Sequence, residues 1–184
     1  GHVGRFAHMK NHKYMLQILE QCIRMEKETK LQETVMMFLG DGELKEEIRK
    51  KAVEMGIESR ILFMGNRGDV YRYYQAMDYF LLPSLYEGLP GTAIEAQASG
   101  LPGILSDAVT KEAVITDLLQ MRSIEEDAKL WAEEIIKSAS ETRKREETEA
   151  DSKASDIKDR KRGDYAKLVK KASFDVKEQA KKMQ

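Results

Sequence analysis

The passage from Phe80 to Asp107, FLLPSLYEGLPGTAIEAQASGLPGILSD, constrains the fold more than any other part of the chain. An apolar run from Tyr79 to Leu82 ends at Pro83, which is typical of a buried strand that leaves a sheet at its carboxyl edge. A turn rich in glycine and proline follows, and the spacing of residues 92–98 predicts a short helix that stops at the next glycine. A second apolar run, residues 103–106, predicts another strand.

This strand–turn–helix unit predicts an anion site. Free backbone N–H groups and the positive end of the helix dipole point to one place, where phosphate is the usual occupant. Two carboxylates frame the turn, because Glu87 precedes the glycines and Glu95 lies about one turn into the helix. Since carboxylates repel phosphate, we expect them to bind hydroxyl groups instead. A nucleotide sugar carries both phosphates and hydroxyls, so the pattern favours a nucleotide-sugar site.

The rest of the chain, as far as residue 138, alternates between strand patterns and helical spacings. Further strands are predicted at residues 2–6, 35–39, 61–64 and 118–121, and a helix is predicted at residues 124–138. This order predicts an α/β fold with a doubly wound parallel sheet of about six strands and right-handed crossovers. Ligands of such folds collect at the carboxyl edge of the sheet.

The end of the chain has a different composition. Of the 44 residues from 141 to 184, 24 are charged, and a segment with so few apolar residues cannot bury a core of its own. We therefore predict a nucleotide-sugar-binding domain over residues 1–138 and a charged, helical or partly disordered tail over residues 139–184. Within the tail, the spacing of Tyr165, Leu168, Val169 and Ala172 predicts a short amphipathic helix.

The charge balance excludes some classes of partner. The chain has 31 Lys and Arg residues against 32 Asp and Glu, so no overall field favours nucleic acid or an anionic membrane surface.

The single cysteine, Cys22, excludes disulfides within the chain, and its helical spacing predicts a buried position. No apolar run reaches the length of a membrane span. We expect a cytoplasmic location, with peripheral association at the inner face of the membrane left open.

Two other kinds of site are disfavoured by spacing. The turn at residues 40–42, Gly-Asp-Gly, does not continue into G-x-G-x-x-G, so we do not expect it to bind nicotinamide or flavin cofactors. His8 and His12 have the i, i+4 spacing of a metal pair but lack a third ligand, so no metal site is predicted. Asp41 and Glu43 are expected to shape this turn and cap the helix that follows.

The stretch PSLYEGLPGTAIEAQASGLP, with Glu87 and Glu95 in E-x7-E spacing, resembles the signature of retaining GT-B glycosyltransferases of the large family 4, or group 1, type. Five further stretches match in the family's order: HVGRF, KNH, FLGDGEL, ILFMGNRGDV and MDYFLLPS. The resemblance covers residues 2–138 and, more weakly, FDVKEQAKKM near the end. It implies a Rossmann-like domain, the C-terminal, donor-binding half of a GT-B fold. An N-terminal domain that carries most of the acceptor site is then expected to precede this chain.

The resemblance also implies roles for individual residues. Glu95 is expected to accept both ribose hydroxyls. Glu87, the candidate catalytic residue, is expected beside the transferred sugar, where it binds a hydroxyl or stabilises positive charge at the anomeric carbon. Arg5 and Lys10 are expected to grip the donor diphosphate. The base pocket is expected to be lined by Asn66, Arg67 and Val70. Backbone N–H groups for phosphate and sugar contacts are expected from Gly88, Leu89, Gly91 and Thr92.

The function implied is retaining transfer of a hexose or N-acetylhexosamine from a nucleotide diphosphate to a glycan or lipid-linked acceptor. LPSLYEGLP and FDVKE resemble the capsular and exopolysaccharide branch, which favours UDP as the nucleotide. No metal or other cofactor is implied, because cationic side chains and a helix dipole offset the leaving-group charge in this family. A GT-B sugar-nucleotide epimerase and a catalytically silent nucleotide-sugar-binding module are the alternatives. Without an N-terminal domain, the chain is expected not to transfer sugar.

Overall fold

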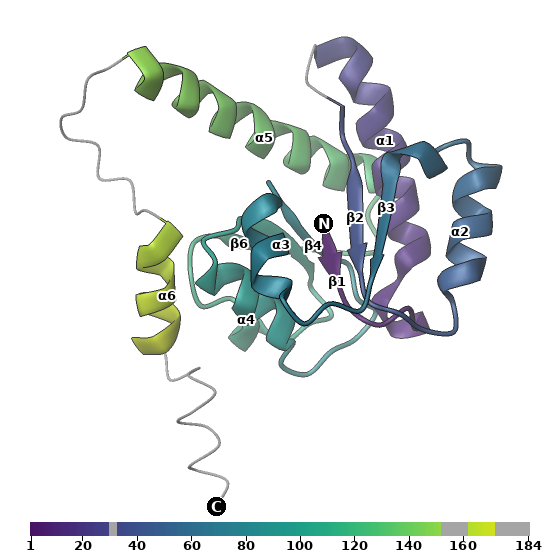
Figure 1. The fold of residues 1–184 in the computed structure, drawn as a ribbon, viewed down its shortest axis with the longest axis horizontal. Helices are drawn as coiled ribbons and strands as arrows, with labels where there is room; N and C mark the ends of the chain where they lie inside the picture. Colours follow the sequence, from purple (N-terminus) through teal and green to yellow (C-terminus); the bar gives the residue numbers. More distant parts are fainter. Residues whose placement is uncertain (30–32, 152–161, 172–184) are drawn as a thin grey trace, which may run out of the picture.

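The structure, a computed structural model, describes residues 1–29, 33–151 and 162–171 of the 184-residue chain. Strands and helices alternate along the chain (Figure 1). The strands are β1 (His2–Val3), β2 (Met36–Leu39), β3 (Ile61–Gly65), β4 (Phe80–Leu82), β5 (Gly103–Ser106) and β6 (Leu119–Arg122). The helices are α1 (His12–Thr29), α2 (Lys45–Glu54), α3 (Val70–Ala76), α4 (Gly91–Ala98), α5 (Ala128–Asp151) and α6 (Arg162–Lys171). This is the alternating order that the sequence predicts.

The strands form two parallel sheets of three strands each, with the orders β1-β2-β3 and β4-β5-β6. Backbone hydrogen bonds join the two sheets. The Gly1 nitrogen donates to the Tyr79 carbonyl at 2.7 Å, and the Leu81 N–H donates to the Gly1 carbonyl at 2.9 Å. The spatial order is therefore 3-2-1-4-5-6, the order of a doubly wound nucleotide-binding fold, with its reversal between β1 and β4. The predicted doubly wound parallel sheet is confirmed.

Helices cover both faces of the sheet because successive strand residues point into two different cores. Phe38, Leu81 and Ile104 pack with α1, α2 and α5 in one cluster. Their neighbours Leu39 and Leu105 pack with α3 and α4 in the other. Strands buried on both faces are apolar throughout rather than alternating, which explains the solid apolar runs of the sequence. Each fully buried side chain of this kind contributes about 1.5–3 kcal/mol to folding.

The last two helices differ from the prediction in extent. α5 begins at Ala128 and continues to Asp151, well past residue 138, where the predicted helix ends. Its first turns pack against α1, and Trp131 is fully buried there. α6 packs against α4 and buries Val169. The division into parts at residues 138 and 139 stays a prediction. Residues 152–161 and 172–184, with Ala172 and FDVKEQAKKM, lie outside the described residues.

Cys22 and the lengths of the helices bear on two expectations from the sequence. Cys22 is buried on α1, and burial raises the pKa of its thiol to about 12, so its predicted place in the core is confirmed. Across the described ranges, none of the helices combines the length and the apolar character needed to cross a membrane.

A buried glutamine fastens α4 to the loop that follows β5. The Nε2 group of Gln97 donates to the Ala113 carbonyl at 2.8 Å. Its Oε1 accepts the N–H groups of Ile115 and Thr116, each at 2.9 Å. Both polar atoms of this fully buried side chain are therefore paired, as a buried amide requires. The helix that carries Glu95 is thereby held in one position on the sheet.

Two buried histidines pack together where β1 meets α1. Nδ1 of His2 donates to the Leu81 carbonyl at 2.9 Å, and the His2 ring meets the His12 ring edge-on, with centroids 5.0 Å apart. His12 also stacks on Phe6 at 4.2 Å. Within the described residues, His2 Nε2 and both His12 nitrogens have no hydrogen-bond partner.

Burial, assisted by the charge of Lys10, lowers the pKa of His12 from 6.5 to about 4. Burial and the neighbouring His12 also lower the pKa of His2 well below 6.5.

We expect the free energy of unfolding to fall as the pH drops from 6.5 to 4. A histidine whose pKa is lowered by folding binds fewer protons in the folded state than in the unfolded state. Its contribution is therefore present above the unfolded pKa and is lost as the pH falls through the folded pKa. For His12 this loss is about 3 kcal/mol. Urea unfolding of wild type and His12→Phe, which keeps the stacking on Phe6, measures it at both ends of this range.

Carboxylates that titrate in the same pH range also change the free energy of unfolding, but they do so equally in wild type and in His12→Phe. The difference in pH dependence between the two proteins is therefore the contribution of His12. His8→Gln removes an exposed histidine and should keep the full pH dependence of wild type. The same loss of stability in wild type and in His12→Phe would contradict the prediction.

Candidate functional site

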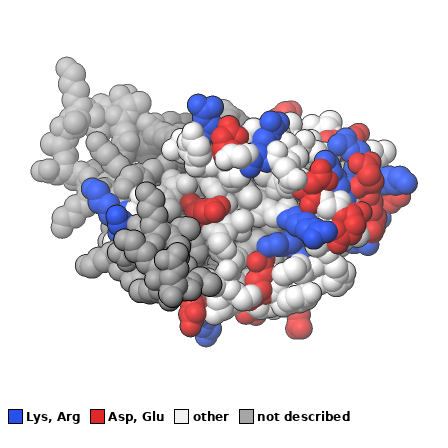
Figure 2. Space-filling model, turned by 60° about the horizontal axis from the view of Figure 1, so that its bottom comes forward, with Lys and Arg blue, Asp and Glu red and all other residues white. Residues whose placement is uncertain are grey.

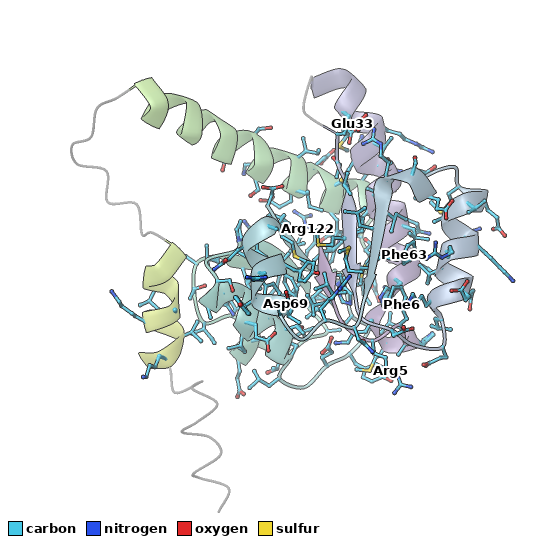
Figure 3. All side chains as sticks on the ribbon, in the orientation of Figure 1. Arg5, Phe6, Glu33, Phe63, Asp69 and Arg122 are labelled. Carbon is cyan, nitrogen blue, oxygen red and sulfur yellow. The ribbon has the colours of Figure 1, made fainter. Side chains whose placement is uncertain are left out.

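The carboxyl ends of the strands gather at one edge of the molecule, the lower edge in Figure 1. Arg5 lies at this edge, and Phe6 and Phe63 lie above it (Figure 3) with their rings stacked at 6.1 Å. Figure 2 turns this edge toward the viewer and shows charges of both signs intermixed on the side of α1 and α2. The middle of the face is mostly uncharged (Figure 2). A ligand at this edge therefore meets charges of both signs on one side and a mostly uncharged surface in the middle.

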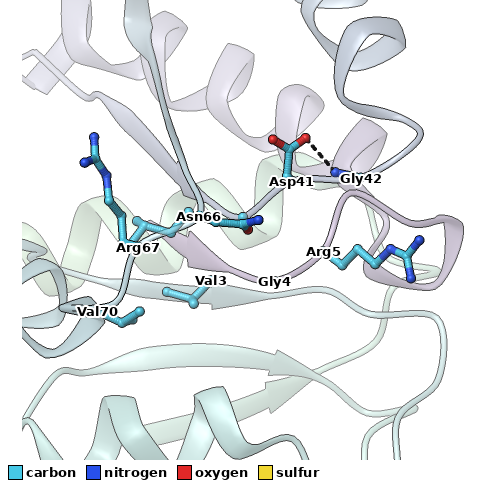
Figure 4. A pocket seen from close by; sticks show the side chains of 10 residues that line it. Val3, Gly4, Arg5, Asp41, Gly42, Asn66, Arg67 and Val70 are labelled. Carbon is cyan, nitrogen blue, oxygen red and sulfur yellow. Dashed lines mark hydrogen bonds between the residues drawn. The ribbon is translucent and has the colours of Figure 1, made fainter.

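A pocket of about 540 Å³ opens at the ends of β1, β2 and β3 (Figure 4). Arg5, Asn66, Arg67 and Val70 are among the residues that line it. The two arginines stand at opposite ends of the pocket, and the Asn66 side chain extends between them (Figure 4). The structure therefore brings together the three residues predicted for the base and one of the two predicted phosphate-binding cations.

One wall of this pocket is main chain, because the loops after β1 and β2 touch through their backbones. Gly40 has a φ of +136°, and a Cβ atom there would lie 2.1 Å from the Gly4 carbonyl oxygen. A Cβ atom at Gly42 would lie 2.6 Å from the carbonyl oxygen of Phe6. Only glycine fits at residue 40. These glycines were not predicted as site residues, because a turn pattern does not reveal which distant loop it touches.

Asp41 shapes its turn as predicted, but the predicted helix cap is wrong. Its Oδ1 accepts the Gly42 N–H at 2.9 Å, and its Oδ2 accepts the Lys45 ammonium at 3.2 Å. These two donors, the backbone N–H first, lower the pKa of Asp41. Among the described residues, no side chain caps α2 with a hydrogen bond. Glu43 pairs instead with Arg5, with 3.4 Å between Oε2 and Nη2, in an exposed position.

The other predicted cation, Lys10, is paired with the predicted catalytic carboxylate. Nζ of Lys10 lies 2.7 Å from Oε1 of Glu87, and the side chains are only 13% and 8% exposed. The same carboxylate oxygen accepts the Ser84 hydroxyl. Leu85 N–H also donates to the Met9 carbonyl at 2.8 Å. These contacts fasten the loop after β1 to the loop after β4, across the point where the strand order reverses. Ser84 was not predicted as a site residue, because it has no spacing signal of its own.

The turn before α4 has the features of an anion site. The helix begins at Gly91, after Pro90, and its first turn has no acidic residue. No side chain in the described part of the chain caps it. Its positive end therefore meets no competing carboxylate from its own first turn. Thr92 Oγ1 is buried and has no hydrogen-bond partner among the described residues. Three of the residues predicted to offer backbone N–H groups are exposed: Gly88, Leu89 and Gly91.

Glu95 is exposed on α4, where it was predicted, and accepts a hydrogen bond from a second helix. The hydroxyl of Tyr74, on α3, lies 2.9 Å from Glu95 Oε2. Tyr74 is itself buried, and sequence analysis did not single it out because its spacing is that of a core residue. Neither Glu87 nor Glu95 is among the residues that line the 540 Å³ pocket. Both lie at the β4 side of the same edge.

The predicted absence of a metal site stays a prediction. In the part of the chain that the structure describes, no group of three or more His, Cys, Asp or Glu side chains is placed to hold a metal ion. Of the pair with metal-like spacing, His8 is exposed and His12 is buried.

The sequence is similar to those of known glycosyltransferases. A family model described as "Glycosyl transferases group 1" matches residues 1–141. EpsF of Bacillus subtilis is 36% identical over 152 residues, which cover 80% of this chain and 37% of EpsF. The UDP-Gal:α-D-GlcNAc-diphosphoundecaprenol α-1,3-galactosyltransferase of Escherichia coli is 35% identical over 106 residues, which cover 57% of this chain and 27% of that enzyme.

Solved structures share the fold. HepE of Anabaena, in complex with UDP and glucose, matches with a TM-score of 0.68 at 19% identity, over 94% of this chain and 42% of HepE. The chain therefore spans less than half the length of the relatives that it matches.

We expect Lys10→Met to lower the free energy of unfolding by about 3 kcal/mol, because it leaves the Glu87 carboxylate shielded from water without its cation. The double variant Lys10→Met/Glu87→Gln should recover most of this loss, since a neutral amide needs no counter-charge. Urea unfolding of wild type, both single variants and the double variant gives the coupling energy.

The control is Lys13→Met, which breaks the exposed pair of Lys13 and Glu47. It should change the free energy of unfolding by less than about 1 kcal/mol. Equally small effects at Lys10 and Lys13 would show that Glu87 is not shielded from water in solution.

Proposed function

The chain belongs to the group 1 glycosyltransferases, and from that membership we propose that it is the donor-binding half of a retaining GT-B enzyme. In this proposal it binds a UDP-hexose or UDP-N-acetylhexosamine, whose sugar is transferred to a glycan or lipid-linked acceptor. We assign most of the acceptor site to an N-terminal domain of the same enzyme. The Escherichia coli relative is named as a galactosyltransferase, which does not favour the epimerase alternative.

One observation carries the proposal: two carboxylates flank an uncapped helix N-terminus at the point where the strand order reverses. Glu87 precedes the start of α4, and Glu95 follows it by about one turn. A diphosphate alone would be repelled by carboxylates placed here. A nucleotide sugar has its diphosphate between two groups of hydroxyls, those of the ribose and those of the sugar. The order Glu95, helix N-terminus, Glu87 matches the order ribose, diphosphate, sugar.

The pocket beside these groups is assigned to the base. Its volume of about 540 Å³ falls within the range of small-molecule pockets, about 300–1,000 Å³. Apolar side chains of Val3, Leu39 and Val70 line it together with Asn66. The amide of Asn66 can both donate and accept hydrogen bonds, and the edge of uracil offers both kinds of group. The UDP complex of HepE and the UDP-galactose in the name of the Escherichia coli relative support uridine as the nucleoside.

Charge on the leaving diphosphate is offset in this proposal by two side chains and the α4 dipole, without a metal ion. Among the described residues, Arg5 is paired only with Glu43, in an exposed position, and such a pair contributes at most about 1 kcal/mol. A phosphate group can therefore replace Glu43 as its partner. Lys10 has three N–H donors, so it can keep Glu87 and donate to a phosphate oxygen as well. Glu87 is then held where positive charge develops at the anomeric carbon.

Isothermal titration of the chain with UDP and with NAD tests the proposal. We expect UDP to bind and NAD not to bind at millimolar concentration. Glu95→Ala should weaken UDP binding by about 2–3 kcal/mol, because two hydrogen bonds to a carboxylate are lost and water replaces them in part. The domain should stay folded with only a small fall in melting temperature, since Glu95 is exposed and the Tyr74 hydroxyl keeps the Thr92 carbonyl as an acceptor.

Glu46→Ala, at an exposed carboxylate on α2 away from the site, is the matched control and should bind UDP as wild type does. Equal binding of UDP and NAD would contradict the proposed ligand class. Unchanged UDP affinity in Glu95→Ala, with a lower melting temperature, would make Glu95 a structural residue.

Excess EDTA should leave the affinity for UDP unchanged, because side chains and the helix dipole meet the phosphate charge in this proposal. The same titration with added manganese completes the test. An affinity that falls in EDTA and returns with manganese would replace this part of the proposal with metal-dependent donor binding.

A further inference from the structure

Tyr74 is a core residue whose hydroxyl contacts Glu95, a predicted site residue. It lies on α3, is only 1% exposed, and packs its ring edge-on against Phe80 of β4 with centroids 6.1 Å apart. The same buried cluster includes Val3 and Leu39, two residues that also line the pocket. A phenol ring has two side-chain torsions, and close packing leaves it one position. The hydroxyl of Tyr74 is therefore a fixed point in the structure.

The hydroxyl is a donor, and its main acceptor is Glu95. It lies 2.9 Å from Oε2 of Glu95 and 3.3 Å from the Thr92 carbonyl oxygen. The carboxylate is both the closer acceptor and the charged one, and charged acceptors form the stronger hydrogen bonds. Burial and the Glu95 charge raise the pKa of Tyr74, so the hydroxyl keeps its proton. The contact thus runs from a buried donor to an exposed carboxylate.

An exposed glutamate on a helix ordinarily samples many orientations, and ordering it on binding weakens the affinity for a ligand. A fixed donor to Oε2 removes much of that freedom before the ligand arrives and leaves Oε1 for the ligand. The contact also joins α3 to α4. Because α3 begins at Val70, beside the predicted base pocket, the base contacts and the ribose contacts are held at a constant separation.

We propose that Tyr74 is a positioning residue of this site, which holds the Glu95 carboxylate in the orientation that accepts the ribose hydroxyls. The inference rests on the proposed function, in which Glu95 binds ribose. Tyr74 does not touch the nucleotide and acts only through Glu95. A tyrosine that served only to fill the core would not affect how the site distinguishes a ribose from a sugar without hydroxyls.

The test compares UDP with 2′,3′-dideoxy-UDP, which lacks both ribose hydroxyls, by titration calorimetry. Tyr74→Phe removes one oxygen atom and keeps the packed ring. We expect it to weaken UDP binding by up to about tenfold, because the Glu95 side chain must then be ordered when the ligand binds, and to leave the affinity for the dideoxy nucleotide unchanged. Tyr71→Phe makes the same chemical change at an exposed tyrosine of the same helix and should alter neither affinity.

The double variant Tyr74→Phe/Glu95→Ala separates positioning from packing. If Tyr74 acts through Glu95, Tyr74→Phe has no further effect on UDP binding once Glu95 is alanine. Equal losses for both nucleotides, or an undiminished preference for UDP in Tyr74→Phe, would overturn the proposal. If Glu95→Ala itself keeps the preference for UDP over the dideoxy nucleotide, the proposed ribose contact fails. If Glu95→Ala abolishes that preference and Tyr74→Phe leaves it undiminished, only the positioning role fails.

Discussion

The reversal of strand order between β1 and β4 is the constraint on which the whole site depends. Parallel strands end at one edge, and at the reversal the connections that follow β1 and β4 turn to opposite faces of the sheet. Lys10 and Glu87, 77 residues apart in the chain, come within 2.7 Å at this place. In an antiparallel arrangement one of them would lie at the far edge. The sheet topology, more than any local motif, therefore brings a cation, a carboxylate and a helix N-terminus together.

The two carboxylates of this edge are held in different ways. Glu87 is shielded from water and accepts hydrogen bonds from Lys10 and Ser84 through one oxygen. Glu95 is exposed and accepts a hydrogen bond from a buried tyrosine, also through one oxygen. In the proposed site, the second oxygen of each side chain is the one that a ligand hydroxyl reaches. A shielded, charge-paired group suits the reacting sugar, where water must be excluded, and an exposed group suits the ribose, which only binds.

The strands and the frame of the site could be predicted because they depend on local patterns. Solid apolar runs revealed the buried strands to within a few residues, and the spacing around the glycine-rich turn placed Glu87 and Glu95 on either side of a helix start. The contacts of Ser84, Tyr74 and Gly40 could not be predicted, because each depends on which distant segment lies opposite. The tail was predicted as helical or partly disordered, but its continuity with the helix predicted at residues 124–138 was missed. The charged residues after 138 are mostly good helix formers, whereas the prediction weighed their polarity.

The pocket combines a wall that resists substitution with a loop that tolerates it. Any side chain at residue 40 would collide with the Gly4 carbonyl oxygen, so the main-chain wall cannot change without moving β1 or β2. Asn66 and Arg67 are exposed and come from the single loop that precedes α3. In the proposed site, descendants of such a domain could exchange one nucleoside for another through a few substitutions in that loop, while the residues proposed to contact phosphate and sugar stayed as they were. The history of nucleotide preference in such proteins would then be recorded at these loop positions, while the glycines and carboxylates kept the roles proposed for them.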